Sequence, residues 1–214
     1  MEKPIENPFI RNDKLPVITP KNALQLLKEG NLRFVNNKTL DRDLIRLVEK
    51  TATGQFPFAA ILSCIDSRVP AEVVFDQGIG DIFSTRIAGN FVNDDILGSL
   101  EFACKLIGSK IILVLGHTSC GAVKGACDNI KLGNLTQMLA KIKPAVKNIK
   151  TKKGESRTSE NITFVDSVAE ENVRLTIENI KYGSKVLNQL YSNNEIDIVG
   201  AMYDVKTGIV EFFS

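Results

Sequence analysis

The sequence lacks an excess of charge of either sign. Its 214 residues include 27 Lys and Arg against 25 Asp and Glu, a formal net charge of +2. A balance this close to zero gives no electrostatic reason to expect nucleic acid or an anionic membrane as a partner. Long hydrophobic runs are missing too, since the longest reach about half of the ~18 residues that a membrane-spanning helix needs. We therefore expect no nucleic-acid and no membrane partner, and we look for function in a local site.

Cysteine and histidine are also scarce, with four cysteines and one histidine. Four cysteines in a chain of this length do not make a disulfide scaffold. Cys104 and Cys127 lie in helical patterns and are interpreted as buried small apolar groups, because free cysteine is among the most buried residue types. Cys64 and Cys120 instead end or closely follow apolar runs typical of buried strands. These two cysteines and the lone His117 are the candidates for chemistry.

Proline is concentrated at the N-terminal end, where four of the seven prolines fall in the first twenty residues. Proline lacks an N–H and restricts the residue before it, so residues 1–19 are predicted to form an extended arm. This region has no apolar stretch of the signal-peptide type, which predicts a cytoplasmic protein. Thr19 and Pro20 together indicate the cap and first position of a helix. No linker, repeat or low-complexity segment divides residues 20–214, which are predicted to be one domain.

Short apolar runs alternate with helical patterns along this domain. The alternation predicts an α/β fold, with a central, mostly parallel sheet of four strands, helices on both faces and an N-terminal helical arm. A turn at residues 206–208 indicates an additional antiparallel edge strand at the C-terminus. Gly116, just after the third strand, is expected to allow a close approach of backbone. The predicted strands are 59–63, 81–86, 111–115, 196–203 and the edge strand 209–213, and the predicted helices include 41–50, 121–130, 135–150 and 159–182.

Reactive side chains concentrate in two segments, residues 63–68 and 116–121, each just after a predicted strand. In an open α/β sheet, ligands bind beyond the carboxyl ends of the strands, so the two segments converge if their strands are neighbours. Zinc prefers cysteine thiolates and histidine nitrogen, and three such ligands leave a fourth position for water, as in catalytic sites. Cys64, His117 and Cys120 therefore form a candidate zinc site. The alternative is that all three are ordinary core residues.

Asp66 and Arg68 lie beside the first of these ligands. They are two residues apart, so in an extended segment their side chains point the same way. The Asp66 carboxylate would either take the fourth metal position or pair with the guanidinium, which orients a carboxylate through two N–H bonds. A structural ion pair without a metal is the alternative interpretation.

Two long runs resemble the signature of β-class carbonic anhydrases: CIDSRVPAEVVFDQGIGDIFSTRIAGN from residue 64 and GSLEFACKLIGSKIILVLGHTSCGAV from residue 98. The resemblance extends to GAMYDVKTGIVEFF at the C-terminus, and C-x-D-x-R with a distant H-x2-C is a highly specific pair of motifs. It implies one Zn²⁺ per chain, bound by Cys64, His117 and Cys120 next to an Asp66–Arg68 dyad. Residues 20–214 would then be a zinc-binding catalytic domain. The implied activity is reversible hydration of CO2 to bicarbonate and a proton, through attack of a zinc-bound hydroxide on CO2.

The same resemblance implies a substrate pocket. Four residues match positions that bind the substrate or line its cleft: Gln55, Phe83, Ala88 and Gly121. A glutamine at the position of Gln55 is typical of the plant-like branch of the family. In that branch Arg68 would hold Asp66 and leave the fourth zinc position open, whereas in the closed form of the family Asp66 itself is the fourth ligand. Because family members are dimers, often paired into tetramers, we expect a homodimer or homotetramer, with the apolar arm over a neighbouring subunit and the cleft near the interface.

Two other functions remain open on the sequence alone. Relatives with the same ligands hydrolyse carbonyl sulfide or carbon disulfide, which would keep the fold and metal but change the substrate. A non-catalytic zinc-binding or redox-sensing protein is the second alternative, because activated cysteines often lie near cationic groups such as Arg68.

Overall fold

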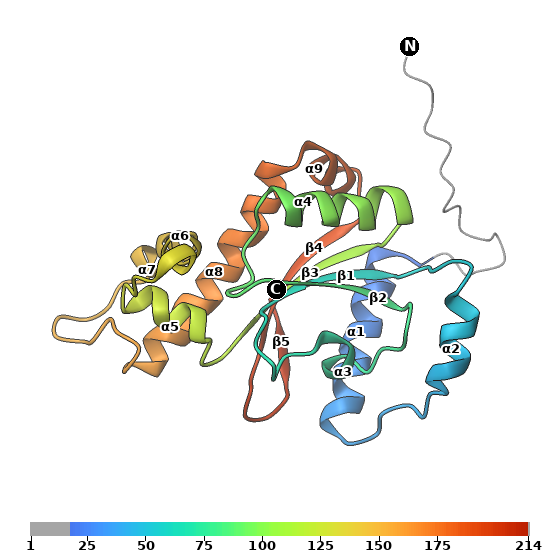
Figure 1. Ribbon diagram of the computed structural model, residues 1–214, viewed down its shortest axis with the longest axis horizontal. Helices are drawn as coiled ribbons and strands as arrows, with labels where there is room; N and C mark the ends of the chain where they lie inside the picture. Colours follow the sequence, from blue (N-terminus) through green and yellow to red (C-terminus); the bar gives the residue numbers. More distant parts are fainter. Residues whose placement is uncertain (1–17, 214) are drawn as a thin grey trace, which may run out of the picture.

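The computed structural model describes residues 18–213, and a five-stranded sheet runs through its centre (Figure 1). The strand order is β2-β1-β3-β4-β5, in which β1 pairs in parallel with β2 and β3, β4 continues in parallel with β3, and β5 is antiparallel to β4. The strands are β1 (Ala59–Ser63), β2 (Ile82–Arg86), β3 (Ile111–His117), β4 (Asp197–Tyr203) and β5 (Val210–Phe212). This topology confirms the predicted parallel sheet with an antiparallel C-terminal edge strand.

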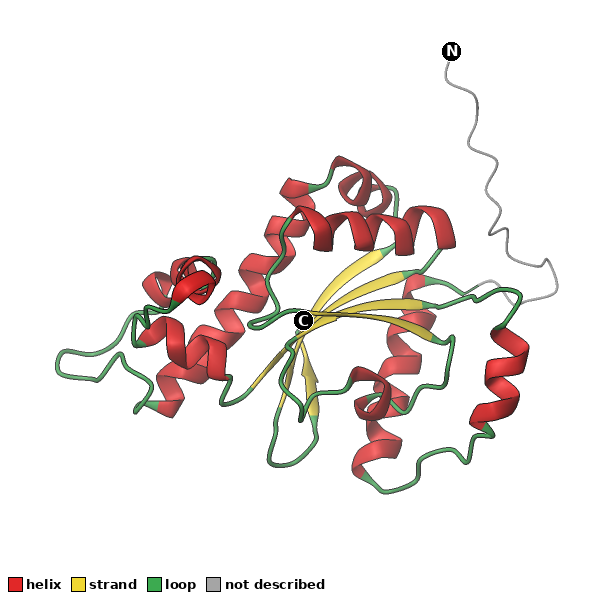
Figure 2. Ribbon diagram, viewed as in Figure 1, coloured by secondary structure: helices red, strands yellow, loops and turns green. Residues whose placement is uncertain are grey.

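Helices cover both faces of the sheet, as Figure 2 shows. Alternate residues of each strand face opposite ways, so Ile61 and Leu113 pack on the side of α1 and α3, whereas Ala60 and Ile112 pack against α4, η1, α8 and α9. These helices are α1 (Pro20–Val35), α3 (Ala71–Val74), α4 (Asp94–Glu101), the π-helical η1 (Phe102–Ile107), α8 (Ile162–Gly183) and α9 (Lys185–Ser192), and α2 (Leu44–Thr51) lies beyond α1. The two-sided α/β architecture is as the sequence predicts.

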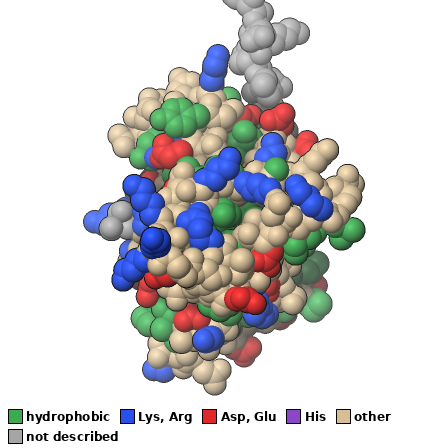
Figure 3. Space-filling view, turned by 90° about the vertical axis from the view of Figure 1, so that its left-hand side faces the viewer, with side chains coloured by type: hydrophobic (Ala, Val, Ile, Leu, Met, Phe, Trp, Pro, Cys, Tyr) green, Lys and Arg blue, Asp and Glu red, His purple; other side chains and the backbone are tan. Residues whose placement is uncertain are grey.

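A third apolar cluster lies beyond the carboxyl ends of the strands. It joins the first half of α8 to α5 (Gly121–Cys127), α6 (Gly133–Ala140) and α7 (Lys143–Asn148), and it includes both Cys64 and Cys120. Figure 3 faces this end of the molecule and shows Lys and Arg side chains spread over it. The segment from residue 141 to residue 157 contributes to that charge, with seven Lys or Arg and one acidic residue. The candidate site thus lies in an apolar cluster at a basic end of the protein.

Helix α8 can approach this end of the sheet because β3 contains a glycine there. A Cβ on Gly116 would lie 2.6 Å from Cγ2 of Val173 and 2.7 Å from the sulfur of Met202. Both distances are far below ordinary van der Waals contact, so only a glycine lets α8 pack this closely behind His117. The prediction that Gly116 allows a close backbone approach is confirmed.

Several elements differ from those predicted. The single helix expected over 135–150 is two helices, α6 and α7, because Pro144 at the start of α7 has no N–H to continue the first one. Helix α9 and the short α3 were not predicted. The predicted cap at Thr19 is present, since its hydroxyl accepts the Asn22 N–H at 3.2 Å, but residues 1–17 of the predicted arm lie outside the described residues. No helix in the described part of the chain has the length and apolar character to cross a bilayer.

Candidate metal centre

Two cysteines and the histidine converge at the carboxyl ends of two neighbouring strands. Cys64 directly follows β1, His117 is the last residue of β3, and Cys120 is the N-cap of α5. Because β1 and β3 pair in parallel, both loops leave the same edge of the sheet. The ligand atoms all lie within 4.8 Å of one another, the two sulfurs are 3.9 Å apart, and all three residues are buried. The predicted convergence of the two segments is therefore present.

The imidazole of His117 fits a metal ligand. Its Nδ1 lies 2.9 Å from the Thr118 carbonyl, which assigns the ring proton to Nδ1 because a carbonyl can only accept. The other nitrogen, Nε2, is then an acceptor, and it is buried without a hydrogen-bond partner among the described residues. A buried polar atom without a partner costs about 1–3 kcal/mol. A cation between Nε2 and the two sulfurs would remove this cost, and soft sulfur with imidazole nitrogen is the donor set that Zn²⁺ prefers.

The two sulfurs lie within hydrogen-bond distance of each other, and each changes the acidity of the other. A hydrogen bond from the Cys120 thiol lowers the pKa of Cys64 to about 4, against the opposing effect of burial, and the Gly89 N–H lowers it further. The neighbouring Cys64 thiolate, together with burial, raises the pKa of Cys120. A cation that binds both sulfurs would displace the protons that they carry.

Asp66 is held by Arg68 beside this cluster. The guanidinium donates from Nε to Oδ1 at 2.9 Å and from Nη2 to Oδ2 at 2.8 Å, and the Arg68 backbone N–H adds a bond to Oδ1 at 3.0 Å. The Arg68 guanidinium holds the pKa of Asp66 well below its usual range. Asp66 Oδ2 lies 3.9 Å from His117 Nε2, beyond hydrogen-bond distance. The carboxylate is therefore ionised, oriented and next to the cluster.

Three further residues, which the sequence did not single out, hold the ligand loops in place. Arg86, at the end of β2, donates to the carbonyl of Cys64 at 2.9 Å and to that of Asp66 at 2.6 Å. On α8, Asp166 accepts the Ser119 N–H at 2.7 Å and the buried Asn172 donates to the Gly89 carbonyl at 2.8 Å. Isolated polar residues in an amphipathic helix give no sequence signal for such contacts, although Arg86 could have been suspected from its place at a strand end.

A pocket of about 270 Å³ opens next to the cluster. It brings together four residues singled out from the sequence, Cys64, Asp66, Ala88 and Gly121, and its far wall is apolar and comes from the α5–α6 region, with Ile130, Leu135, Met138 and Leu139. Two other predicted residues lie elsewhere in this chain. Gln55 is exposed on the loop before β1, at the opposite end of that strand from Cys64, and Phe83 pairs in register with Ala60 and packs on Phe102, with ring centroids 6.2 Å apart. Their assignment to the substrate pocket stays a prediction.

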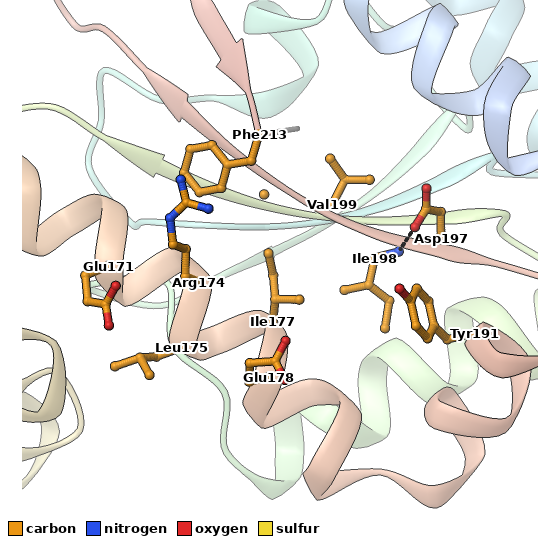
Figure 4. Close-up of a pocket in the computed structure, with 11 residues that line it drawn as sticks. Glu171, Arg174, Leu175, Ile177, Glu178, Tyr191, Asp197, Ile198, Val199 and Phe213 are labelled. Carbon is orange, nitrogen blue, oxygen red and sulfur yellow. Dashed lines mark hydrogen bonds between the residues drawn. The ribbon is translucent and has the colours of Figure 1, made fainter. Parts of the chain in front are cut away.

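A larger pocket, of about 630 Å³, lies between α8, α9 and the β4–β5 edge and is drawn in Figure 4. It contains none of the candidate site residues. Its arginine, Arg174, lies over the ring of Phe213 and pairs with Glu170 at 2.7 Å, and the Asp197 carboxylate accepts the Ile198 N–H at 2.8 Å. With its charged groups already engaged, this pocket gives no reason to place the chemistry there.

The fold and the site together define an α/β protein with a buried cluster of two cysteines and one histidine that could hold a metal ion. The family model described as carbonic anhydrase matches residues 59–210. Carbonic anhydrase 2 of Mycobacterium tuberculosis is 34% identical over 200 residues, which cover 91% of this chain and 93% of the relative. The chain therefore belongs to the carbonic anhydrase family, in its β class, whose members hydrate CO2 reversibly to bicarbonate.

Solved structures agree with this assignment. The β-carbonic anhydrase of Coccomyxa, in complex with acetazolamide, superposes with a TM-score of 0.67 at 26% identity, over 77% of this chain and 75% of that one. A tetrameric β-carbonic anhydrase of the ascomycete Sordaria macrospora has a TM-score of 0.69 at 20% identity, over 90% of this chain and 98% of that one. The second likeness is one of fold.

Proposed function

We propose that this carbonic anhydrase binds one Zn²⁺ through Cys64, His117 and Cys120 and hydrates CO2 beside it. The observation that carries the proposal is the buried Nε2 of His117, which has no partner among the described residues and faces two sulfurs. Zinc at this position would supply Lewis acidity, which lowers the pKa of water and so makes a nucleophile available. The remaining chemistry belongs to the side chains around it.

Asp66 and Arg68 would orient the reacting groups. The Arg68 guanidinium holds Asp66 through two hydrogen bonds, and the oxygens of the ionised Asp66 carboxylate can only accept hydrogen bonds. It would therefore orient a hydroxyl next to the metal position without occupying that position. These two hydrogen bonds from Arg68 support the open, plant-like form of the site, in which Asp66 is not a zinc ligand.

The pocket walls suit a small uncharged substrate. Ala88 and Gly121 present little or no side chain beside Cys64 and Asp66, which leaves room for a linear molecule near the metal. The apolar wall between α5 and α6 excludes water from the far side and favours CO2, which carries no charge. Bicarbonate, being an anion, gains less from this wall and would leave through the basic end of the molecule.

We also propose that a second copy of the chain completes the pocket. Helix α2 has no buried residue and exposes Ile45 (72%) and Val48 (50%), while Phe102 beside Phe83 is 40% exposed. Apolar surface of this kind is typical of an interface. Gln55 and Phe83 lie far along the sheet from their own Cys64 and would reach the site of the partner. The tetrameric state of the Sordaria relative supports assembly, and we expect a homodimer or homotetramer.

A cytoplasmic location is proposed from the state of the four cysteines. The four cysteines form no disulfide in the described part of the chain, which suits a reducing compartment. Fractionation of cells that express the full chain would test this, and recovery outside the cytoplasm would contradict it.

The test of the zinc site combines metal analysis with a stopped-flow CO2 hydration assay. Wild type is expected to hold one zinc per chain, and Cys64→Ala and His117→Ala should lose both metal and activity. Cys104→Ala is the matched control, because Cys104 is equally buried but packs in a different cluster. Wild-type protein that carries no zinc after purification in zinc-containing buffer, or a His117→Ala variant with full activity, would refute the proposal.

The test of assembly is sedimentation of wild type and Ile45→Glu at micromolar concentration. A charged side chain in an apolar interface is costly, so the variant should shift toward a 23.6 kDa species. A wild type that is already a 23.6 kDa monomer would contradict the proposed partner.

A further inference from the structure

Gly89 connects the metal centre to helix α8. Its N–H donates to Cys64 Sγ, with an N–S distance of 3.4 Å, and its carbonyl accepts from the Asn172 side-chain amide at 2.8 Å. The residue has φ +83°, and a Cβ there would lie 2.4 Å from Cδ1 of Ile142. The conformation favours glycine, and a Cβ would also displace the end of the Ile142 side chain. The direction of the N–H that reaches the sulfur therefore depends on how this one residue is held.

Asn172 is an unusual residue for its place. It lies in the interior of α8, is 3% exposed, and its helix neighbours Val168, Ala169 and Val173 all belong to apolar clusters. Asparagine favours a helix interior less than leucine does, and a buried amide is costly unless it is hydrogen-bonded. An apolar side chain would suit the packing better. The hydrogen bond to the Gly89 carbonyl is the contact that compensates for burying this amide.

We propose that Asn172 is a positioning residue of the metal centre, which keeps the Gly89 N–H directed at the Cys64 sulfur by holding the Gly89 carbonyl. The inference rests on the proposed zinc site. A hydrogen bond to a ligand sulfur fixes the direction of its lone pairs and reduces the charge it donates to the metal. Outer contacts of this kind typically change metal affinity by 10- to 100-fold.

The variant that tests this is Asn172→Leu, which removes the donor while keeping an apolar-compatible side chain of similar size. Zinc release to a chromophoric chelator should become about 10-fold faster or more. In the Co²⁺-substituted protein, the sulfur-to-cobalt charge-transfer band should move to lower energy, because the thiolate becomes more electron-rich. The thermal midpoint of the metal-free protein reports stability separately, because leucine suits the apolar packing but leaves the buried Gly89 carbonyl without its donor.

Thr176→Val is the matched control. Thr176 lies one turn further along α8 than Asn172 and is 1% exposed, so its burial matches that of the tested residue. Its substitution perturbs the same helix and should leave both metal readouts at wild-type values. If Thr176→Val changes them as much as Asn172→Leu does, the effect is one of helix packing and the proposal is wrong.

Unchanged zinc release and an unchanged cobalt spectrum in folded Asn172→Leu would also overturn the proposal. Should that variant fail to fold, Asn172→Ser is judged by the same two readouts, since serine is small and polar. The proposed function is tested separately by the wild type. Wild type without zinc contradicts the metal site itself, whereas zinc-loaded, active wild type beside an indistinguishable Asn172→Leu contradicts this inference alone.

Discussion

Replacing Arg68 by alanine should release Asp66 from its present orientation. The guanidinium supplies two of the three hydrogen bonds that residue 68 donates to this carboxylate, at 2.9 and 2.8 Å, and the backbone N–H supplies the third. Because the Arg68 side chain is 51% exposed, solvent screens the pair, and its two bonds together are worth about 1 kcal/mol. A loss of this size changes a conformational equilibrium by roughly 5-fold.

Once released, the Asp66 carboxylate lies close enough to reach the metal position, since Oδ2 is 3.9 Å from His117 Nε2. We therefore expect Arg68→Ala to lower kcat/KM for CO2 about 5-fold or more. The Co²⁺-substituted variant should also respond less to azide, because a carboxylate would compete for the fourth position. Stopped-flow hydration and absorption titration measure the two effects.

The double variant Asp66→Ala/Arg68→Ala separates blocking from simple loss of charge. If the freed carboxylate blocks the metal, its removal should restore the azide response that Arg68→Ala loses. Arg174→Ala is the control, because Arg174 is as exposed as Arg68 and pairs with Glu170, and it lines a pocket that contains none of the candidate site residues. Wild-type activity in Arg68→Ala, or no recovery of azide binding in the double variant, would refute the reasoning.

Three other predictions concern the pocket, acid stability and pH. Gly121→Ala places a methyl group beside the metal cluster, at a point where no atom lies within 4 Å, and should lower kcat/KM for CO2 by about 10-fold in stopped-flow assays. Gly98→Ala is the control and should leave kcat/KM unchanged, because Gly98 is an exposed helical glycine with equally open space around it. Although burial alone would raise the pKa of Asp76, hydrogen bonds from Arg33 and Arg42 lower it. Asp76→Asn should therefore cost on the order of 3 kcal/mol in urea unfolding at neutral pH, a difference that is complete above pH about 4 and shrinks as the pH falls below that value. Two thiolate ligands neutralise the charge of zinc, so CO2 hydration should be faster at about pH 9 than at about pH 6.5.

Each of these has a clear contrary result. Equal activity in Gly121→Ala and wild type would show that this face of the pocket does not carry substrate. A wild-type advantage over Asp76→Asn that grows in acid would contradict the sign of the pKa shift. A flat rate profile across the stated pH range would contradict the argument from ligand charge.

The sequence predicted the sheet well because each buried strand is a short apolar run between clear breaks. Residues 59–63 and 111–115 were assigned from composition alone, and β3 continues only as far as His117. The metal cluster followed from the topology, since parallel neighbours must place their following loops together. The split between α6 and α7 was missed because the helical periodicity continues through Pro144, which interrupts the backbone bonds but not the pattern.

What the sequence could not predict depends on contacts between distant segments. Asn172 and Gly89 are 83 residues apart, and neither position alone indicates the other. Gln55 and Phe83 show a second limit of sequence-based prediction. The resemblance assigns both residues to the substrate pocket, but it does not say whether they belong to the pocket of their own chain or to that of a second copy. The clustering of Cys64, His117 and Cys120 was predictable because each lies at or close to a strand end. The residues behind them were not predictable, because the sequence of helix α8 carries no chemical signature.

The outer edge of β4 has a consequence for how copies of this chain can associate. β5 covers β4 at Ala201–Tyr203, and the Phe213 N–H reaches the Gly200 carbonyl at 2.9 Å, so in the described part of the chain no strand pairs with Asp197–Val199 on this edge. Asp197 donates its own N–H to the β3 side, so the next N–H, that of Ile198, faces outward, where the Asp197 carboxylate occupies it. A strand from another molecule that approached this edge would meet the negative charge of Asp197 and would find no free N–H donor at Ile198. This arrangement protects the sheet from edge-to-edge pairing with other chains. Growth of the sheet is thus discouraged at β4, which agrees with our proposal that copies associate through the face around α2.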